Sequence, residues 1–235
     1  MTGRRRSEEA SRLTARPGEV VQMPQERGLQ PLGLGDRRDG LLYVPTSHPL
    51  PGPRPLLVLL HGAGSEASHS IAPFTAAAEE RGLLLLAPDS RGGTWDVIRG
   101  GYGPDVAFID RALAHVFARY PVDPARVVLD GFSDGASYAL SLGLGNGDLF
   151  THLMAFAPGF MAPAAQVGAP RIFVAHGDGD RVLPIDRCSR VIVPQLQRAG
   201  YDVTYREFHG GHTVPREVLE EALEWLDEKA PAGPS

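Results

Sequence analysis

The feature that most constrains the fold is a glycine-flanked serine directly after an apolar run. The segment Gly131-Phe132-Ser133-Asp134-Gly135 follows residues 126–130 and precedes a helix-compatible stretch that begins at Ala136. Glycine on both sides of the serine allows a strand to reverse sharply into a helix, because a Cβ would collide where the two backbones meet. The turn places Ser133 at a helix N-terminus, where free backbone N–H groups stabilise an anion. The pattern therefore predicts a strand, turn and helix that present the Ser133 hydroxyl above a sheet edge.

Composition limits the class of protein. The chain has 235 residues, of which 43% are hydrophobic and 22% charged, as is typical of one globular domain. The net charge of -5 gives no reason to expect nucleic acid or an anionic membrane as a partner. No apolar run approaches transmembrane length, so we expect no membrane insertion. The single cysteine, Cys188, cannot form an internal disulfide, which favours a reducing, cytoplasmic location.

Short apolar runs alternate with longer helix-compatible stretches from Pro55 onward. This alternation is typical of an α/β fold with a mostly parallel central sheet and helices on both faces. Strands are expected at residues 41–44, 56–60, 83–87, 127–130, 153–156, 172–175 and 203–208. Helices are expected after the serine and at residues 73–82, 105–120 and 217–229.

The same pattern gives a domain organisation. We expect residues 1–19 to form a disordered leader, residues 20–230 a single domain and residues 231–235 a tail. Only residues 159–170 separate two of the predicted strands, which leaves no room for a cap domain. The site should then be an open cleft.

Polar residues follow three other predicted strands. The run at 56–60 ends in His61-Gly62-Ala63-Gly64, a loop that can donate a second N–H to an oxyanion. The strand at 172–175 leads into His176-Gly177-Asp178-Gly179-Asp180, and the strand at 203–208 leads into His209-Gly210-Gly211-His212. The chain thus carries a serine, then an acid, then a histidine, each at a strand end.

On these motifs the chain resembles the serine esterases of the α/β-hydrolase superfamily over residues 55–229. It is similar to the phospholipase/carboxylesterase group and to the polyhydroxybutyrate depolymerase and feruloyl-esterase groups. The most specific motif is His-Gly-x-x-Asp-x-Val-x-Pro at residues 176–184. The resemblance implies an α/β-hydrolase fold, a catalytic triad of Ser133, Asp180 and His212, and hydrolysis of a small-molecule carboxylic ester through an acyl-enzyme. Relatives often have glutamine, asparagine or methionine after the nucleophile, where this chain has Asp134.

Each role follows from chemistry. A serine hydroxyl needs a base to take its proton, an imidazole titrates near working pH, and a carboxylate orients the imidazole ring. The oxyanion would be bound by the backbone N–H groups of Ala63 and Asp134. Gly62, Gly64 and Trp95 are candidate substrate-binding residues. Trp95 either offers an apolar plate to the substrate or packs as a rim residue on a neighbouring helix. No cofactor and no metal are expected.

Alternatives exist for several of these roles. Asp178 competes with Asp180 as the acid, and His209 competes with His212 as the base. Together with His176, these histidines and aspartates also suggest a metal site, although Gly210 and Gly211 argue against the helical spacing of zinc peptidases. Cys188 lacks flanking glycines and is better explained as a structural thiol.

Three alternative functions also remain. A peptidase or an acyltransferase would use the same triad, and a binding protein would keep the scaffold without turnover. The sequence leaves both a monomer and a homodimer open.

Overall fold

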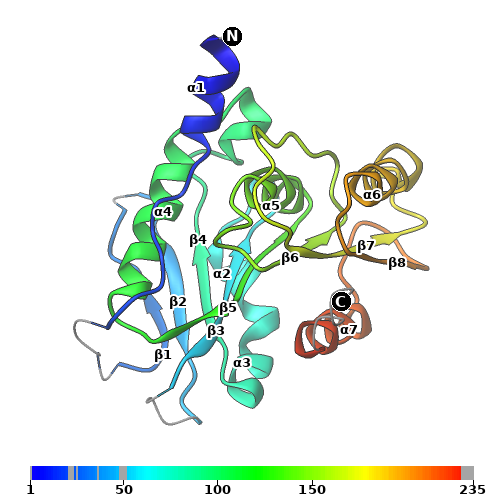
Figure 1. Cartoon of the computed structure of the whole chain (residues 1–235). Coiled ribbons are helices and arrows are strands. Elements are labelled where there is room, and N and C mark those ends of the chain that lie inside the picture. The colour runs from blue at the N-terminus through cyan, green and yellow to red at the C-terminus, as the bar shows by residue number, and fades with distance from the viewer. Residues whose placement is uncertain (1, 21–23, 25, 36, 48–51, 229–235) are drawn as a thin grey trace, which may run out of the picture.

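A single mixed sheet of eight strands runs through the described residues of this computed structural model (Figure 1). The structure describes residues 2–20, 24, 26–35, 37–47 and 52–228, so the predicted tail at 231–235 lies outside the described residues. The strand order is β1-β2-β4-β3-β5-β6-β7-β8. The strands are β1 (Gly28–Pro31), β2 (Gly40–Val44), β3 (Arg54–Leu60), β4 (Leu84–Pro88), β5 (Val122–Phe132), β6 (His152–Phe156), β7 (Arg171–Gly177) and β8 (Val203–Phe208).

The sheet is mostly parallel, as the sequence predicts. Strands β3 to β8 pair in parallel, whereas β1 pairs antiparallel with β2 and β2 antiparallel with β4. Each expected strand is present, with bounds that differ by a few residues. The bounds of β1 could not be predicted, because its four residues carry no apolar run.

Helices cover both faces of the sheet (Figure 1). One face packs against α4 (Pro104–Phe117), α5 (Asp134–Leu144) and α6 (Ser189–Arg198), and the other against α2 (Ala67–Ile71), α3 (Thr75–Arg81) and α7 (Arg216–Asp227). The 3-10 turns are η1 (Ala72–Phe74), η2 (Asp96–Arg99) and η3 (Ile185–Arg187). Within the described residues, no helix is long and apolar enough to cross a membrane.

The core divides into two layers because side chains of a strand alternate between its faces. All seven residues of β3 are buried. Its Leu56, Val58 and Leu60 enter the layer under α4 and α5, whereas Leu57 and Leu59 enter the layer under α2 and α7. A strand that is covered on both faces has a continuous run of apolar residues in its sequence. For this reason β3 could be predicted from the sequence.

The N-terminal segment differs from the disordered leader that the sequence predicts. Residues 2–10 form α1 (Thr2–Ala10), and the chain then lies against α4 and α5 as far as residue 16. Leu13 is buried, and its N–H donates to Asn146 Oδ1 at 2.9 Å. The Asp110 carboxylate accepts the next two backbone N–H groups. These partners lie about a hundred positions away along the chain, so the local polar composition concealed them.

Candidate active site

Loops after four parallel strands converge at one edge of the sheet. Ser133 follows β5, Asp180 follows β7 and His212 follows β8, while the loop that begins at His61 follows β3. The carboxyl ends of parallel strands lie at the same sheet edge, which is where open α/β sheets place their ligand sites. The fold therefore assembles residues that are far apart in the sequence.

The turn at Ser133 is as tight as its glycines suggest. Ser133 has φ 59° and ψ -119°, a backbone conformation that costs an L-residue about 1–3 kcal/mol. A Cβ on Gly131 would lie 2.3 Å from the carbonyl carbon of Gly135, and one on Gly135 would lie 2.1 Å from Leu60 O. Both positions therefore exclude any side chain, because no real Cβ comes so close to backbone.

The structure brings Ser133, His212 and Asp180 into one hydrogen-bonded chain. His212 Nε2 lies 2.9 Å from Ser133 Oγ, and His212 Nδ1 lies 2.6 Å from Asp180 Oδ2. A carboxylate only accepts, so the imidazole N–H sits on Nδ1 and Nε2 is left to accept the serine proton. Phe132 packs against the His212 ring, with the two centroids 4.8 Å apart. The arrangement meets the geometric requirement for a base-activated nucleophile.

Asp180 is held as an anion by the turn that follows it. Its side chain is fully buried, and Oδ1 accepts the N–H groups of Val182 and Leu183 at 2.8 and 2.9 Å. Burial acts to raise the pKa of Asp180, but the hydrogen bonds from Leu183, His212 and Val182 outweigh it, and the net pKa lies below its ordinary value. The carboxylate is therefore ionised near neutral pH.

His176 supports this acid, a role that the sequence analysis missed. It is fully buried, its Nε2 donates to Leu183 O at 2.8 Å, and the same nitrogen lies 3.2 Å from Asp180 Oδ2. Its Nδ1 accepts the Ser189 hydroxyl at 2.6 Å. Burial lowers the pKa of His176, in keeping with a neutral ring. Its signals in the sequence were its position at the end of a buried strand and its place as the first residue of the motif at residues 176–184.

The competing acid and base form a separate pair. His209 Nδ1 lies 2.6 Å from Asp178 Oδ2, and the His209 side chain is fully exposed. This pair sits at the surface, while Asp180 and His212 contact Ser133 directly or through one partner. Among the described residues, no group of three or more His, Cys, Asp or Glu side chains could hold a metal. Cys188 is buried, and burial raises the pKa of its thiol.

His61 shapes the loop beside the serine. Ser90 N donates to His61 Nε2 at 3.0 Å, so the ring carries its proton on Nδ1, which donates to Gly62 O at 2.7 Å. Burial lowers the pKa of His61 and keeps the ring neutral. Gly62 lies against the turn, since a Cβ there would be 3.6 Å from Ser133 Cβ.

The backbone N–H groups of Asp134 and Ala63 remain the candidates for an oxyanion site. Asp134 is the first residue of α5, so its N–H has no acceptor within the helix. Ala63 is exposed in the loop that holds Gly62 against the serine. Gly64 differs, because its N–H donates to Gly93 O at 2.7 Å and is committed to the loop.

Comparison with known proteins begins at the level of sequence. No protein-family model matches the chain. NocK of Nocardia uniformis subsp. tsuyamanensis, provisionally named an esterase, is 30% identical over 158 residues, which are 62% of this chain and 45% of NocK. The bifunctional acetylxylan esterase/xylanase XynS20E of Neocallimastix patriciarum is 31% identical over 160 residues, which are 63% of this chain and 22% of that protein. The chain spans less than half the length of these curated relatives.

Solved structures extend the similarity over most of the chain. The crystal structure of esterase PE8 matches with a TM-score of 0.66 and 26% identity, over 80% of this chain and 96% of that one. The chain has the α/β-hydrolase fold. The fold class predicted from the sequence is confirmed. Within residues 157–170, all of them described, the chain that joins β6 to β7 has no helix.

Trp95 does not offer the apolar plate to substrate that the sequence suggested. Its side chain is fully buried, its ring stacks on Tyr138, and its Nε1 donates to His61 O at 2.8 Å. The tryptophan therefore supports the His61 loop from within the core. The alternative interpretation, in which Trp95 packs on a neighbouring helix, agrees better with the structure. Trp95 is, however, a core residue and not a rim residue.

Two serines of α5 bind the chain that follows β6. Ser137 Oγ accepts the Gly159 N–H at 2.9 Å, and Ser141 Oγ accepts the Ala162 N–H at 2.9 Å. These hydrogen bonds attach the loop after β6 to the helix that follows Ser133. A helix interior conceals such contacts in a sequence, because serine there usually bonds to its own backbone.

A buried acid lies in β5, three residues before Ser133. Asp130 is 4% exposed, and its Oδ1 is buried with no hydrogen-bond partner in the described residues. Burial raises the pKa of Asp130 well above its ordinary value, against a smaller opposite effect of the Gly131 N–H. This property cannot be recognised from the sequence, because Asp130 follows an apolar run and resembles an ordinary residue at a strand end.

Asp130→Asn is expected to gain stability relative to wild type as pH rises from 4 to 8. Because the pKa of Asp130 is raised in the folded state, its carboxylic acid contributes fully to stability at pH values below the pKa of the unfolded state. This contribution is lost as pH rises through the pKa of the folded state, by up to about 1.4 kcal/mol per pH unit. Asparagine has no proton to lose. Urea unfolding of both proteins at pH 4, 6 and 8 measures the difference, and a difference independent of pH would contradict the assignment.

Proposed function

We propose that this α/β-hydrolase is a serine-dependent carboxylic ester hydrolase that acts through an acyl-enzyme on Ser133. The observation that carries the proposal is the hydrogen-bonded chain from Ser133 Oγ through His212 to Asp180. Support comes from the strained turn under the serine and from the similarity to proteins named as esterases. The proposed partner is a small-molecule ester.

In the first step, Ser133 Oγ attacks the ester carbonyl carbon while His212 Nε2 takes the hydroxyl proton. The resulting imidazolium is stabilised by Asp180, which is already ionised. The carbonyl oxygen becomes an oxyanion, and the backbone N–H groups of Ala63 and Asp134 are the proposed donors to it. Loss of one such donor costs about 3 kcal/mol in comparable enzymes.

In the following steps, His212 returns the proton to the alkoxide, the C–O bond breaks and the alcohol leaves. Water then attacks the acyl-enzyme, with His212 again taking a proton, and the acid is released as Ser133 regains its hydrogen. Each proton move uses the same Nε2 atom, which is why the Nδ1 proton must remain fixed by Asp180.

A panel of substrates tests the reaction class. p-Nitrophenyl esters from acetate to long acyl chains should be hydrolysed, with the optimum chain length reporting pocket depth, while matched p-nitroanilides should react far more slowly. Faster cleavage of the anilides would favour a peptidase, and acyl transfer to an added alcohol in preference to water would favour an acyltransferase. No turnover of any ester would favour a binding protein.

Asp134→Asn is expected to increase the rate on negatively charged esters more than on neutral esters. The Asp134 side chain follows the nucleophile and accepts the Thr94 hydroxyl at 2.6 Å, so its charge is held close to the reacting carbonyl. Partial exposure screens the repulsion, so we expect a change of about 3-fold, equivalent to under 1 kcal/mol. Hydrolysis of a monosuccinate ester and the matching butyrate ester by both proteins gives the ratio. Equal ratios in wild type and variant would contradict this role.

Two statements remain sequence-based predictions, namely a cytoplasmic location and no nucleic-acid partner. Whether the chain is a monomer or a homodimer stays open.

A further inference from the structure

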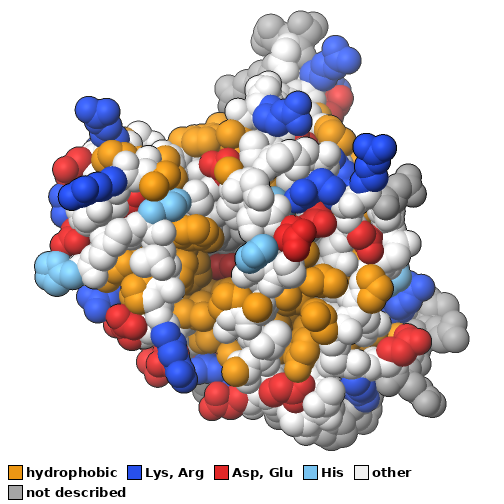
Figure 2. All heavy atoms as spheres, turned by 180° about the vertical axis from the view of Figure 1, so that it is seen from behind, with side chains coloured by type: hydrophobic (Ala, Val, Ile, Leu, Met, Phe, Trp, Pro, Cys, Tyr) orange, Lys and Arg blue, Asp and Glu red, His pale blue; other side chains and the backbone are white. Residues whose placement is uncertain are grey.

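A cavity of about 300 Å³ lies next to the serine on the side of α2 and α7. Its volume is at the lower end of the roughly 300–1,000 Å³ typical of small-molecule sites. Figure 2 shows hydrophobic side chains gathered around a hollow in the view from behind. The apolar part of the cavity wall consists of Leu60, Pro73, Phe74, Phe132, Phe156, Val214 and Leu219.

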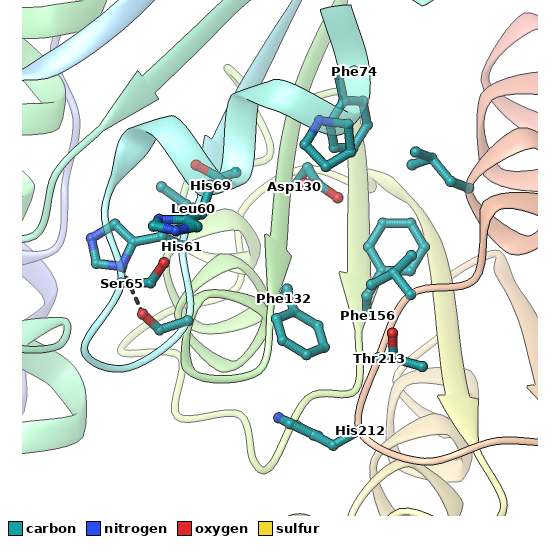
Figure 3. A pocket seen from close by; sticks show the side chains of 15 residues that line it. Leu60, His61, Ser65, His69, Phe74, Asp130, Phe132, Phe156, His212 and Thr213 are labelled. Carbon is teal, nitrogen blue, oxygen red and sulfur yellow. Dashed lines mark hydrogen bonds between the residues drawn. The ribbon is translucent and has the colours of Figure 1, made fainter.

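The cavity adjoins the site already described. Phe132 and His212 line it (Figure 3), as does Gly62, and all three also flank Ser133. A group bound in the cavity would therefore lie beside the base and the loop that holds the proposed oxyanion donor. This is the position of one of the two arms of an ester whose carbonyl is at Ser133.

Asp130 supplies an unpartnered polar group to this apolar cavity. Its carboxyl group lies among the wall residues, near Phe74 in Figure 3. The residue is 4% exposed and Oδ1 has no partner in the described residues. A buried polar atom without a partner carries a desolvation penalty, and a ligand that bonds to it relieves that penalty. Because the pKa of Asp130 is raised, its acid form offers both a donor and an acceptor.

We propose that the cavity is a subsite for one arm of the ester, a short apolar chain or ring that carries a hydroxyl group paired with Asp130. The apolar walls bind the carbon skeleton, and the hydroxyl donates to and accepts from the carboxylic acid. An alcohol hydroxyl matches both capacities of a neutral acid, whereas an ammonium group would need an ionised Asp130. The subsite assigns a substrate class to the proposed esterase and so rests on that function.

The kinetic test uses pairs of esters that differ only in the hydroxyl. Hexane-1,6-diol monoacetate against hexyl acetate tests the alcohol arm, and p-nitrophenyl 6-hydroxyhexanoate against p-nitrophenyl hexanoate tests the acyl arm. Wild type should prefer the hydroxyl ester of one pair about 10-fold or more in kcat/KM, as one buried hydrogen bond allows. Asp130→Leu should abolish the preference, and Asp130→Asn, which keeps a donor and an acceptor, should retain most of it. Because the preference is a ratio of two esters measured with one protein, a general loss of activity in a variant does not change its meaning.

A binding measurement separates the subsite from catalysis. Ligand-observed NMR with cyclopentanol and cyclopentane on the Ser133→Ala variant requires no turnover. Tighter binding of cyclopentanol, lost when Asp130→Leu is added, supports the subsite even if no ester is hydrolysed, in which case only the proposed function fails.

Two outcomes overturn the subsite. One is equal binding of both rings together with no hydroxyl preference in either ester pair. The other is a stronger preference for a trimethylammonium ester than for the hydroxyl ester, which would mean an ionised Asp130 and a cationic substrate.

Discussion

Ser133→Ala is expected to lower kcat for p-nitrophenyl esters by about 10⁶-fold, the loss seen when the nucleophile of a comparable triad is removed. Without Oγ there is no atom for His212 to activate, so the acyl-enzyme cannot form. Alanine can adopt the φ of 59° about as well as serine, and the fold should be retained. Initial rates and a urea unfolding curve on the same preparation measure both effects.

A matched control is available on the same helix. Ser137 is also buried and lies one turn after Ser133. Its hydroxyl donates to the backbone carbonyl of Ser133 at 3.2 Å and accepts the N–H of Gly159 in the loop after β6 at 2.9 Å. Ser137→Ala should cost less than about 10-fold, because these hydrogen bonds position backbone groups and involve no reacting atom. Near-normal activity in Ser133→Ala, or an equal loss in both variants, would contradict the assignment of the nucleophile.

Asp180→Asn is expected to lower kcat/KM by about 10⁴-fold near neutral pH, as the equivalent change does in serine proteases. The asparagine amide cannot stabilise the imidazolium, and its NH₂ group favours a tautomer with the proton on Nε2, which blocks acceptance from Ser133. The substitution keeps the shape of the side chain, so binding of substrate should change much less than kcat.

The neighbouring carboxylate provides the control for this change. Asp178 pairs with the exposed His209 and makes no contact with His212 or Ser133 in the described residues. Asp178→Asn should leave kcat/KM within about 2-fold of wild type, because an exposed ion pair contributes under about 1 kcal/mol. If Asp178→Asn were the inactive variant and Asp180→Asn the active one, the acid would be Asp178.

Features that depend on short-range sterics could be predicted from the sequence. The glycines around Ser133 indicate a turn that admits no side chain at those two positions. The apolar run in β3 indicates a strand that is covered on both faces. The order of serine, acid and histidine then follows from loops that end parallel strands at one sheet edge. For these features the local pattern and the global fold agree.

Features that depend on distant partners could not be predicted. The segment near Leu13 looks polar, yet it is anchored by residues of α4 and the chain after α5. Trp95 sits in a glycine-rich loop that reads as surface, but Tyr138 and His61 enclose it. The unpartnered acid at Asp130 is visible only once the cavity around it is known.

The central claim is that Ser133 is a nucleophile activated by His212 and Asp180. Covalent labelling tests it most directly, because phosphorylation by a phosphorofluoridate, with fluoride as the leaving group, requires an activated hydroxyl but no knowledge of the natural substrate. Wild type is incubated with diisopropyl fluorophosphate, digested and mapped by mass spectrometry. The account predicts one adduct per chain, on Ser133, that is absent from Ser133→Ala and forms far more slowly in Asp180→Asn. An unlabelled Ser133 in folded wild type, or an adduct on another residue, would contradict it.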